Sequence, residues 1–556
     1  GLPAPGREQA WPFVWKALRH LKGDGVAAFL LPAMGFLHNH ARPAVEARKR
    51  LMHEARVCGV VNFADMRFQL FDKALRPAAL IIFGRPQADA PYRFDYLTPK
   101  ADLNLKSRRL ITIGSGDRCR LDSRQVDADP FVFKKRLWMT EPEGRLFNYL
   151  SRFPRLGDLA VEFGALARKR KSAQNRWVVG QGFQPTKVDQ IDRAAHERSH
   201  SSIVATTPYL PVDEFRIPIL DCTGLQPWRD GFVRRDGFEA GFSGPRVLVP
   251  HGIAVGPGGP RLRAAYVEDQ LTFQHIVQAI TVPPGDERRG RLLAGLLNSR
   301  VMLWFAFHGT SSFGADRPKV QQAELLRLPF PAPENLPDPE RSHRAADALV
   351  TVIDQQVGPA GQPPVARLDE RTVIEKIDAL TYEFFCLSET ERILVEDTVE
   401  NTIPAAQPNR GNLPEIWNAS TRSDRRAYAR TLVDNLMDWL DDDCAIGARL
   451  VARNDDLAIL RLTLRDGRSA FDYTEDEETP VGAELARLAR NIEQPLPGNL
   501  QSTPNFRVFL DRDLFLVKPA AKRFWLRSAA VADAHAIALD LQGFVGRRHD
   551  DRPGPD

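Results

Sequence analysis

The order of secondary-structure patterns over residues 10–86 constrains the fold more than any other feature of the sequence. An amphipathic helix with apolar residues at helical spacing opens this region and ends at a glycine. The continuous apolar run VAAFLLPAMGFL follows and is typical of a strand buried on both faces. A second amphipathic helix and two further strands complete the order, with the last two strands as a hairpin. This succession predicts the second half of a doubly wound α/β domain, and we expect the first half to lie elsewhere.

Length and charge limit what the rest of the chain can be. The 556 residues are too many for a single core and predict about three or four domains. The net charge is only +5, from 76 Lys and Arg against 71 Asp and Glu, so a basic binding surface must be local. Five cysteines without a CxxC pair fit a reducing cytoplasm and argue against a disulfide framework or a zinc site. The sequence has no apolar run long enough to span a membrane, so we expect a cytoplasmic protein with no membrane partner.

Shifts in pattern divide the chain into five stretches. The half domain described above ends near residue 90, and the stretch most rich in short β-like runs contains a clear helix near its end. A stretch rich in glycine and proline marks a linker before the C-terminal part. The predicted stretches are a half α/β domain (1–90), a connecting region with helices (91–175), an α+β domain (176–335), a helical segment with a linker (336–406) and an α+β extension of unknown role (407–556).

Self-contained catalytic motifs are absent from the sequence. It has no GxGxxG after a strand, no GxxxxGK[ST], no HExxH and no GxSxG. Its carboxylate clusters are typical of solvated faces. His251, in VPHGI, has no second histidine or cysteine nearby in the sequence, which favours a hydrogen-bonding role over metal binding. We therefore expect no metal site.

Six segments in a fixed order carry a resemblance to a known family. They are FVWKALRHLKGDGVAAFLLPAMGFL, VVNFADMRFQLFDKALRPAALIIF, RWVVGQGF, GPRVLVPHGI, LLNSRVMLWF and RPKVQQAELLRLPFP. Together they resemble γ-class N6-adenine DNA methyltransferases of type IIG restriction–modification and related phage-defence systems, over roughly residues 1–405. The resemblance implies the second half of a doubly wound methyltransferase domain, then an α+β target recognition domain and a mixed C-terminal extension.

The resemblance also implies motifs that this sequence lacks. The S-adenosylmethionine loop and the catalytic Asn-Pro-Pro-aromatic motif should both precede Gly1, and neither occurs in the 556 residues. Either this chain is the C-terminal portion of a longer enzyme, or a partner polypeptide carries the first half. We expect S-adenosylmethionine to be bound mainly outside this chain, and the chain alone to be inactive. An in-frame Asn-Pro-Pro-aromatic motif upstream of Gly1 would identify a complete methyltransferase.

Methylation of adenine N6 requires the base to leave the duplex, and an aromatic ring is wanted against its exposed face. The resemblance places that ring at the start of the loop between the last two strands, where Phe71 stands. Phe68 is the second choice. The alternative is that Phe71 is a core residue on a strand.

The recognition half must supply phosphate contacts and side chains that reach base edges. The stretch Gly309–Lys319 combines a glycine- and serine-rich segment with Arg-Pro-Lys, which suggests a DNA-facing loop with the glycines giving it reach; a solvated connector is the alternative. The predicted DNA-binding residues are Lys187, Arg246, His251, Arg261, Arg263, Arg317 and Lys319.

The sequence thus predicts a site-specific double-stranded DNA adenine-N6 methyltransferase of a restriction–modification or phage-defence system, with this chain carrying DNA recognition. One alternative is a DNA-binding specificity subunit that needs a separate catalytic chain. Another is an effector whose nuclease domain lies outside this chain. Other subunits of a defence system are possible partners. The DNA target, the role of residues 407–556 and any accompanying cleavage are not predicted.

Overall fold

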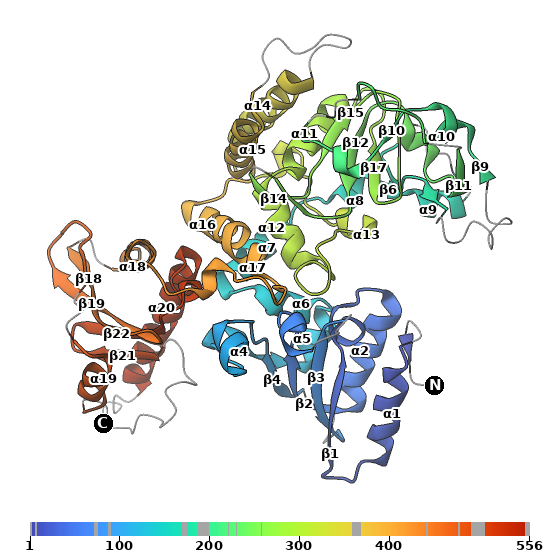
Figure 1. Ribbon diagram of the computed structural model, residues 1–556. Coiled ribbons are helices and arrows are strands. Elements are labelled where there is room, and N and C mark those ends of the chain that lie inside the picture. Colours follow the sequence, from blue (N-terminus) through green and yellow to red (C-terminus); the bar gives the residue numbers. More distant parts are fainter. Residues whose placement is uncertain are drawn as a thin grey trace. The chain divides into compact units, whose positions relative to one another are not determined.

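The computed structural model describes the chain except for residues 1, 2, 6, 7, 72–75, 87–90, 170, 172–174, 187–198, 219, 221, 229, 230, 257, 358–367, 441, 442, 476–478, 491–505 and 551–556. The chain folds into two compact units (Figure 1). The first unit consists of residues 1–145, 314–316 and 400–556, and the second of residues 146–313 and 317–399. Both units mix helices and strands.

The first unit begins with a five-stranded sheet in the order β1-β3-β2-β4-β5. β3 runs antiparallel to both of its neighbours, β2 and β4 are parallel, and β5 is antiparallel to β4. β2 and β3 are thus the expected hairpin pair, and the boundary expected at residue 90 falls inside this sheet. The elements are α1 (Ala10–His20), β1 (Val26–Pro32), α2 (Arg42–Glu54), β2 (Arg56–Asn62), α3 (Arg67–Leu70), β3 (Ala78–Gly84), β4 (Arg93–Leu97), α4 (Leu103–Arg108), β5 (Arg118–Asp122), α5 (Ser123–Ala128) and α6 (Val132–Trp138).

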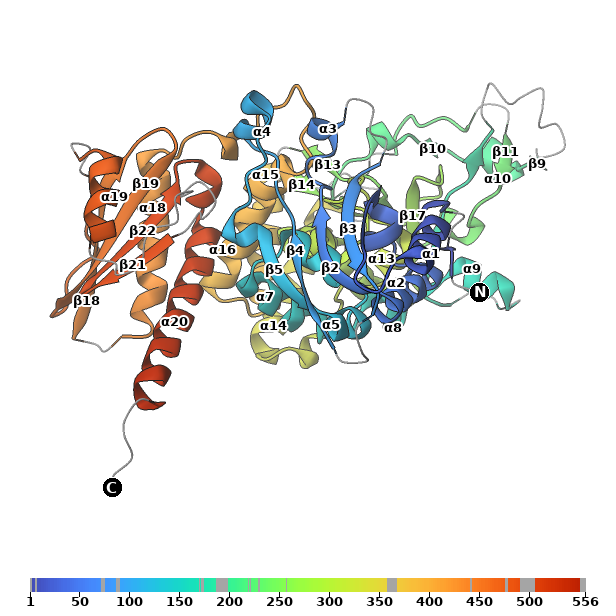
Figure 2. The same cartoon turned by 90° about the horizontal axis from the view of Figure 1, so that it is seen from below.

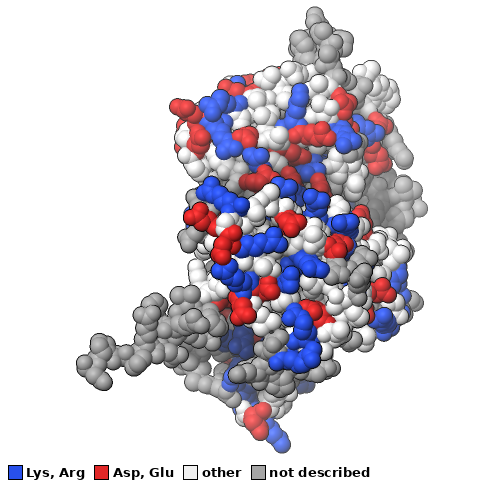
Figure 3. Space-filling view, turned by 90° about the vertical axis from the view of Figure 1, so that its left-hand side faces the viewer, with Lys and Arg blue, Asp and Glu red and all other residues white. Residues whose placement is uncertain are grey.

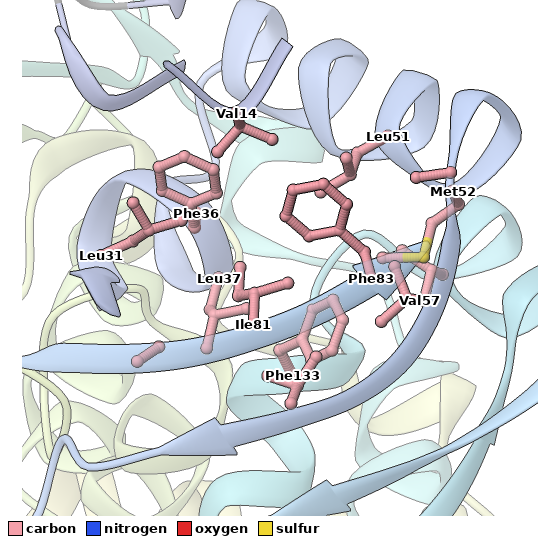
Figure 4. Close-up of a cluster of buried hydrophobic side chains, with 14 of the residues drawn as sticks. Val14, Leu31, Phe36, Leu37, Leu51, Met52, Val57, Ile81, Phe83 and Phe133 are labelled. Carbon is pink, nitrogen blue, oxygen red and sulfur yellow. The ribbon is translucent and has the colours of Figure 1, made fainter. Parts of the chain in front are cut away.

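One face of this sheet carries the core of the domain. Helices α1 and α2 and residues around Phe133 bury their apolar side chains against it, as Figure 4 shows. The predicted stripe of α1 is confirmed, because Trp11, Val14, Trp15 and Leu18 are its buried residues. The Trp11 ring stacks on Phe36, with 4.0 Å between ring centroids.

The other face of the sheet is apolar and open near β1, whereas on β4 and β5 it carries charged side chains such as Asp95 and Arg118. β1 is an edge strand, and its Val26 and Leu30 side chains are 60% and 54% exposed. Leu80 and Ile82, which face the same side on β3, are only partly buried. The prediction that β1 is buried on both faces is therefore wrong for this chain, because within its described part nothing covers the Val26 and Leu30 side chains on this face.

The C-terminal part of the first unit is a second five-stranded sheet, in the order β20-β18-β19-β22-β21. Helices α18 and α20 pack on one face and α19 packs on the other (Figure 2). The face seen from the side of β18 and β19 mixes acidic and basic side chains without a field of one sign (Figure 3). The elements are α18 (Arg422–Met437), β18 (Cys444–Arg453), β19 (Leu457–Asp466), β20 (Tyr473–Glu475), α19 (Val481–Arg490), β21 (Phe506–Leu510), β22 (Asp513–Pro519) and α20 (Arg527–Asp550).

The second unit is built on a sheet in the order β15-β12-β17-β7-β6. β12 and β17 are antiparallel, β7 is antiparallel to β17, and an aromatic core lies against the sheet. Two antiparallel helices, α14 and α15, pack beside α11 and α12. The elements used below are β6 (Val161–Glu162), β7 (Val178–Gln181), β12 (Arg246–Pro250), β13 (Ala254–Gly256), β14 (Gly259–Arg261), β15 (Ala265–Val267), β17 (Val277–Thr281), α11 (Glu287–Leu297), α12 (Arg300–Gly309), α13 (Gln322–Leu325), α14 (Pro339–Val357) and α15 (Glu370–Phe384).

A search of the described helices finds none with the length and apolar character needed to cross a membrane.

Candidate nucleic-acid interface

Three polar side chains meet at one end of the sheet in the second unit. The register pairs Gln181 with Gln278, and Gln278 with Val249, so the end of β7, the end of β12 and the start of β17 lie together. Gln181 is the last residue of β7, His251 follows β12, and His275 precedes β17. The amide nitrogen of Gln181 lies 3.4 Å from His251 Nε2. The sheet register therefore gathers groups that can donate and accept hydrogen bonds at a single edge.

The segment Arg317–Lys319 is attached to this edge by backbone hydrogen bonds. The Ile253 N–H donates to the Pro318 carbonyl over 2.9 Å, and the Val320 N–H donates to the His251 carbonyl over 2.9 Å. Gly252 and Lys319 form an isolated antiparallel bridge. These bonds and the bridge hold Arg-Pro-Lys beside VPHGI and bring Lys319 next to His251.

The two histidines of this edge are held in their neutral form. Burial, and to a lesser extent the charge of Lys319 and the nearby His275, lower the pKa of His251 from 6.5 to about 4. Burial also lowers the pKa of His275. Neutral imidazoles offer one donor and one acceptor each, so this edge combines neutral hydrogen-bonding groups with a single ammonium charge.

The loop that carries Arg317 is fixed by a buried carboxylate. Glu324 accepts hydrogen bonds from the Ser311 N–H (2.7 Å), the Ser311 hydroxyl (2.6 Å) and the Gln321 N–H (3.0 Å). The Ser312 hydroxyl donates to the Arg317 carbonyl over 3.1 Å. The expectation that glycines give this loop reach is therefore wrong, since the segment is tied down on both sides of Arg317.

Arg317 is nevertheless open to solvent, and Lys319 is partly exposed. Over the described part of the chain, neither side chain forms an ion pair with another residue. A rigid backbone with two unneutralised cations is suited to hold an anion, because no protein carboxylate has to be displaced first.

Two of the predicted DNA contacts are instead internal to the protein. Arg246 is fully buried on β12 and donates to the carbonyls of Gly244 and Asp269 over 2.6 Å each. Burial lowers the pKa of Arg246 to about 10. Arg261 is also buried and forms a two-pronged pair with Asp378, with N–O distances of 2.7 and 2.8 Å. We therefore assign both arginines to the core and remove them from the predicted DNA-facing set.

The remaining predicted contacts in this unit lie away from the polar edge or outside the described residues. Arg263 is half-buried, has a left-handed backbone (φ of 56°) and lies over the Phe215 ring at 5.7 Å. Burial and the nearby Arg216 lower the pKa of Arg263. Lys187 lies outside the described residues.

In the first unit, Phe71 stands at the end of the short helix α3 and its side chain is 38% exposed. This exposure favours the loop aromatic over the core residue. Phe68 is only partly exposed, and the Arg67 guanidinium covers its ring at 4.7 Å from the centroid. Phe71 is therefore the more accessible of the two rings.

Sequence reasoning did not select Gln181, His275 or Glu324. Gln181 stands in the quoted segment RWVVGQGF and Glu324 in RPKVQQAELLRLPFP, so both could have been found there, whereas His275 lies outside the quoted segments. Among the described residues, no group of three or more His, Cys, Asp or Glu side chains is arranged to hold a metal ion.

Comparisons with known proteins give only distant structural matches. No model of a known protein family matches the chain, and no curated protein matches its sequence. Among solved structures, it is similar to the type IIG restriction endonuclease BpuSI, with 12% identity, a TM-score of 0.25, and coverage of 68% of this chain and 49% of that protein. It is also similar to the type IIL restriction–modification enzyme MmeI in complex with DNA, with 10% identity, a TM-score of 0.34, and coverage of 71% and 52%. The chain spans about half the length of these two proteins.

Proposed function

We propose that this chain is the DNA-recognition part of a site-specific DNA adenine-N6 methyltransferase of a restriction–modification or phage-defence system. The observation that carries the proposal is the rigid, exposed Arg317–Lys319 segment, bonded to the strand end that also presents His251 and Gln181. Cations beside neutral donors and acceptors are the combination that duplex recognition needs, since phosphates set the register and base edges carry the sequence.

Each side chain of this surface fits a distinct part of duplex DNA. Lys319 is a compact point charge and suits a phosphate, whereas the planar fork of Arg317 suits the two acceptors of a guanine edge. Gln181 can form paired hydrogen bonds with an adenine edge, and the neutral His251 can donate or accept. Pro318 separates the two cations and fixes the backbone between them.

Support for the methyltransferase half of the proposal comes from the first unit. The sheet has one covered face, and its other face is open and apolar near β1, whose outer edge pairs with no strand among the described residues. A doubly wound sheet carries helices on both faces, so the open face suits further strands and helices that continue the sheet. Phe71 is exposed in the loop segment where the family resemblance puts the base-stacking ring.

S-adenosylmethionine is not assigned to residues of this chain. The sequence has no glycine-rich turn between a strand and a helix that could hold the cofactor, and it has no Asn-Pro-Pro-aromatic motif. The residues present do not fit the cofactor, so we derive no step through it. What this chain contributes is DNA binding, register, and the ring of Phe71 against the extruded base.

The lack of catalytic motifs favours a second candidate, a specificity subunit whose partner chain carries the chemistry. Both candidate functions use the same DNA-binding surface in the second unit. They differ in whether a methylase half joins the open face of the sheet in the first unit. A partner nuclease would bind elsewhere and leave the apolar face around Val26 and Leu30 open.

Methyl transfer tests the proposal directly. The purified chain is incubated with duplex DNA and labelled S-adenosylmethionine, alone and together with the methylase half from the same gene or operon. We expect no label in DNA from the chain alone, and N6-methyladenine at one fixed sequence from the combination. Methylation by the combination at sites that do not depend on this chain would refute the proposal.

A further inference from the structure

One buried carboxylate in the first unit connects both ends of the segment that contains Phe71. Asp316 pairs with Arg67, which precedes Phe71, with 2.9 Å between Oδ1 and Nη1. Its other oxygen, Oδ2, lies 3.7 Å from Nη1 of Arg76, which follows Phe71. The Asp316 backbone carbonyl also accepts from Arg67 over 2.9 Å. Asp316 thus holds the two residues that flank the Phe71 segment.

The two contacts differ in burial. The side chains of Arg67 and Asp316 are 8% and 6% exposed, whereas that of Arg76 is 63% exposed. The Arg67–Asp316 pair is therefore buried and fixed, whereas the Arg76–Asp316 contact is exposed to solvent and can adjust. Trp138 adds to the anchor, because its indole N–H donates to the Gly314 carbonyl over 2.8 Å, two residues before Asp316.

A buried ion pair adds little net stability compared with apolar residues of the same size, so stability alone does not explain why a pair stands here.

We propose that Asp316 is a positioning residue, which holds Arg67 and Arg76 on either side of Phe71 in the sequence and so places the Phe71 ring for the extruded base. This inference rests on the proposed function, because it gives the Asp316 cluster a role in placing the base-stacking ring. It adds the prediction that sequence recognition and base extrusion can be separated by changing one carboxylate.

The test uses the complete enzyme, with this chain and its methylase half, and a duplex in which 2-aminopurine replaces the target adenine. The emission of 2-aminopurine rises when the base leaves the stack, so it reports extrusion independently of binding. The variants are Asp316→Asn, Arg76→Gln and Phe71→Ala. The matched control is Glu46→Gln, which removes a carboxylate paired with Arg42 over 2.8 Å on the exposed side of α2 in the same unit.

We expect Asp316→Asn to retain its affinity for the specific duplex while the emission rise falls and turnover drops by about fivefold or more, as for loss of a base–aromatic contact. Phe71→Ala should show the same pattern, and the double variant should be no worse than Phe71→Ala alone. Arg76→Gln should lower emission in the same direction but less, and Glu46→Gln should match the wild type.

The possible results distinguish a failure of the Asp316 inference from a failure of the proposed function. If the wild-type enzyme binds no duplex, or gives no emission rise, the proposed function fails. If the wild type responds and Asp316→Asn gives the full emission, the inference is overturned. If Asp316→Asn does not fold, Arg76→Gln decides, since its exposed side chain can be changed without loss of the core: unchanged emission overturns the inference, and reduced emission with normal affinity supports it.

Discussion

Arg261 allows a direct contrast between a structural arginine and one that contacts DNA. Its guanidinium donates to both oxygens of Asp378, over 2.7 and 2.8 Å, and to the Gly258 carbonyl over 2.9 Å. The two side chains are only 2% and 10% exposed. These bonds hold the β13–β14 hairpin against α15, where Gly258 has no room for a Cβ because Ile374 would lie 2.8 Å away.

Arg261→Ala should therefore lower the free energy of unfolding of the second unit by about 3–5 kcal/mol, since the Asp378 carboxylate is left buried without its main partner. We expect the lower end of that range. Arg300 still reaches Asp378 through its backbone N–H at 2.8 Å and its side chain at 3.3 Å.

Urea denaturation followed by tryptophan fluorescence measures this loss, with Arg317→Ala as the matched control. The exposed Arg317 should change stability by less than about 0.5 kcal/mol. Salt titrations of DNA binding complete the comparison. If Arg261→Ala kept wild-type stability but lost DNA affinity, the assignment of Arg261 to the core would be refuted.

Three further predictions concern the proposed surface and the extruded base. Arg317→Ala should cost about 1–3 kcal/mol of binding free energy at one base position and relax specificity there. Lys319→Ala should weaken binding to all duplexes alike, and the slope of log affinity against log salt concentration should become shallower by about one unit. Unchanged binding by both variants would make this segment a solvated connector. Phe71→Ala should change stability by less than about 1 kcal/mol but reduce base extrusion, and a loss of about 3–5 kcal/mol on unfolding would identify a core ring instead. The pKa of His251 is lowered from 6.5 to about 4 on folding, so between these pH values the unfolded chain binds more protons than the folded chain. The contribution of His251 to the free energy of unfolding should therefore be fully present above about pH 6.5 and be lost as the pH drops toward 4. His251→Gln should make the loss of stability at low pH smaller. If the curve of stability against pH were the same in this variant, the claim that His251 is neutral in the folded chain would be contradicted.

The elements that local pattern controls were predictable from the sequence. Apolar spacing along the sequence predicted the buried stripe of α1, with Trp11 and Val14, and the paired strands β2 and β3. This spacing depends only on residues that are close together in the sequence. The exposure of Val26 on β1 was not predictable, because the sequence of an apolar strand is the same whether one or both of its faces are covered by other elements.

The site was predictable only where a residue stood in a recognisable segment. His251 and Lys319 were chosen from such segments, and the structure brings them together. Arg261 was misassigned because its partner Asp378 lies 117 residues away, and a basic residue between apolar ones does not reveal a distant carboxylate. Gln181 and His275 were missed because they meet only through the register of three strands, which no local pattern specifies.

Selection from a library of random duplexes tests the central claim most directly. The purified chain is immobilised, bound duplexes are recovered over several rounds at moderate salt, and the recovered sequences are compared with those from Arg317→Ala. We expect the wild-type chain to enrich one short sequence containing adenine, and the variant to enrich a broader set that is relaxed at one position. Recovery of unenriched DNA by the wild-type chain, or identical enrichment by wild type and variant, would contradict it.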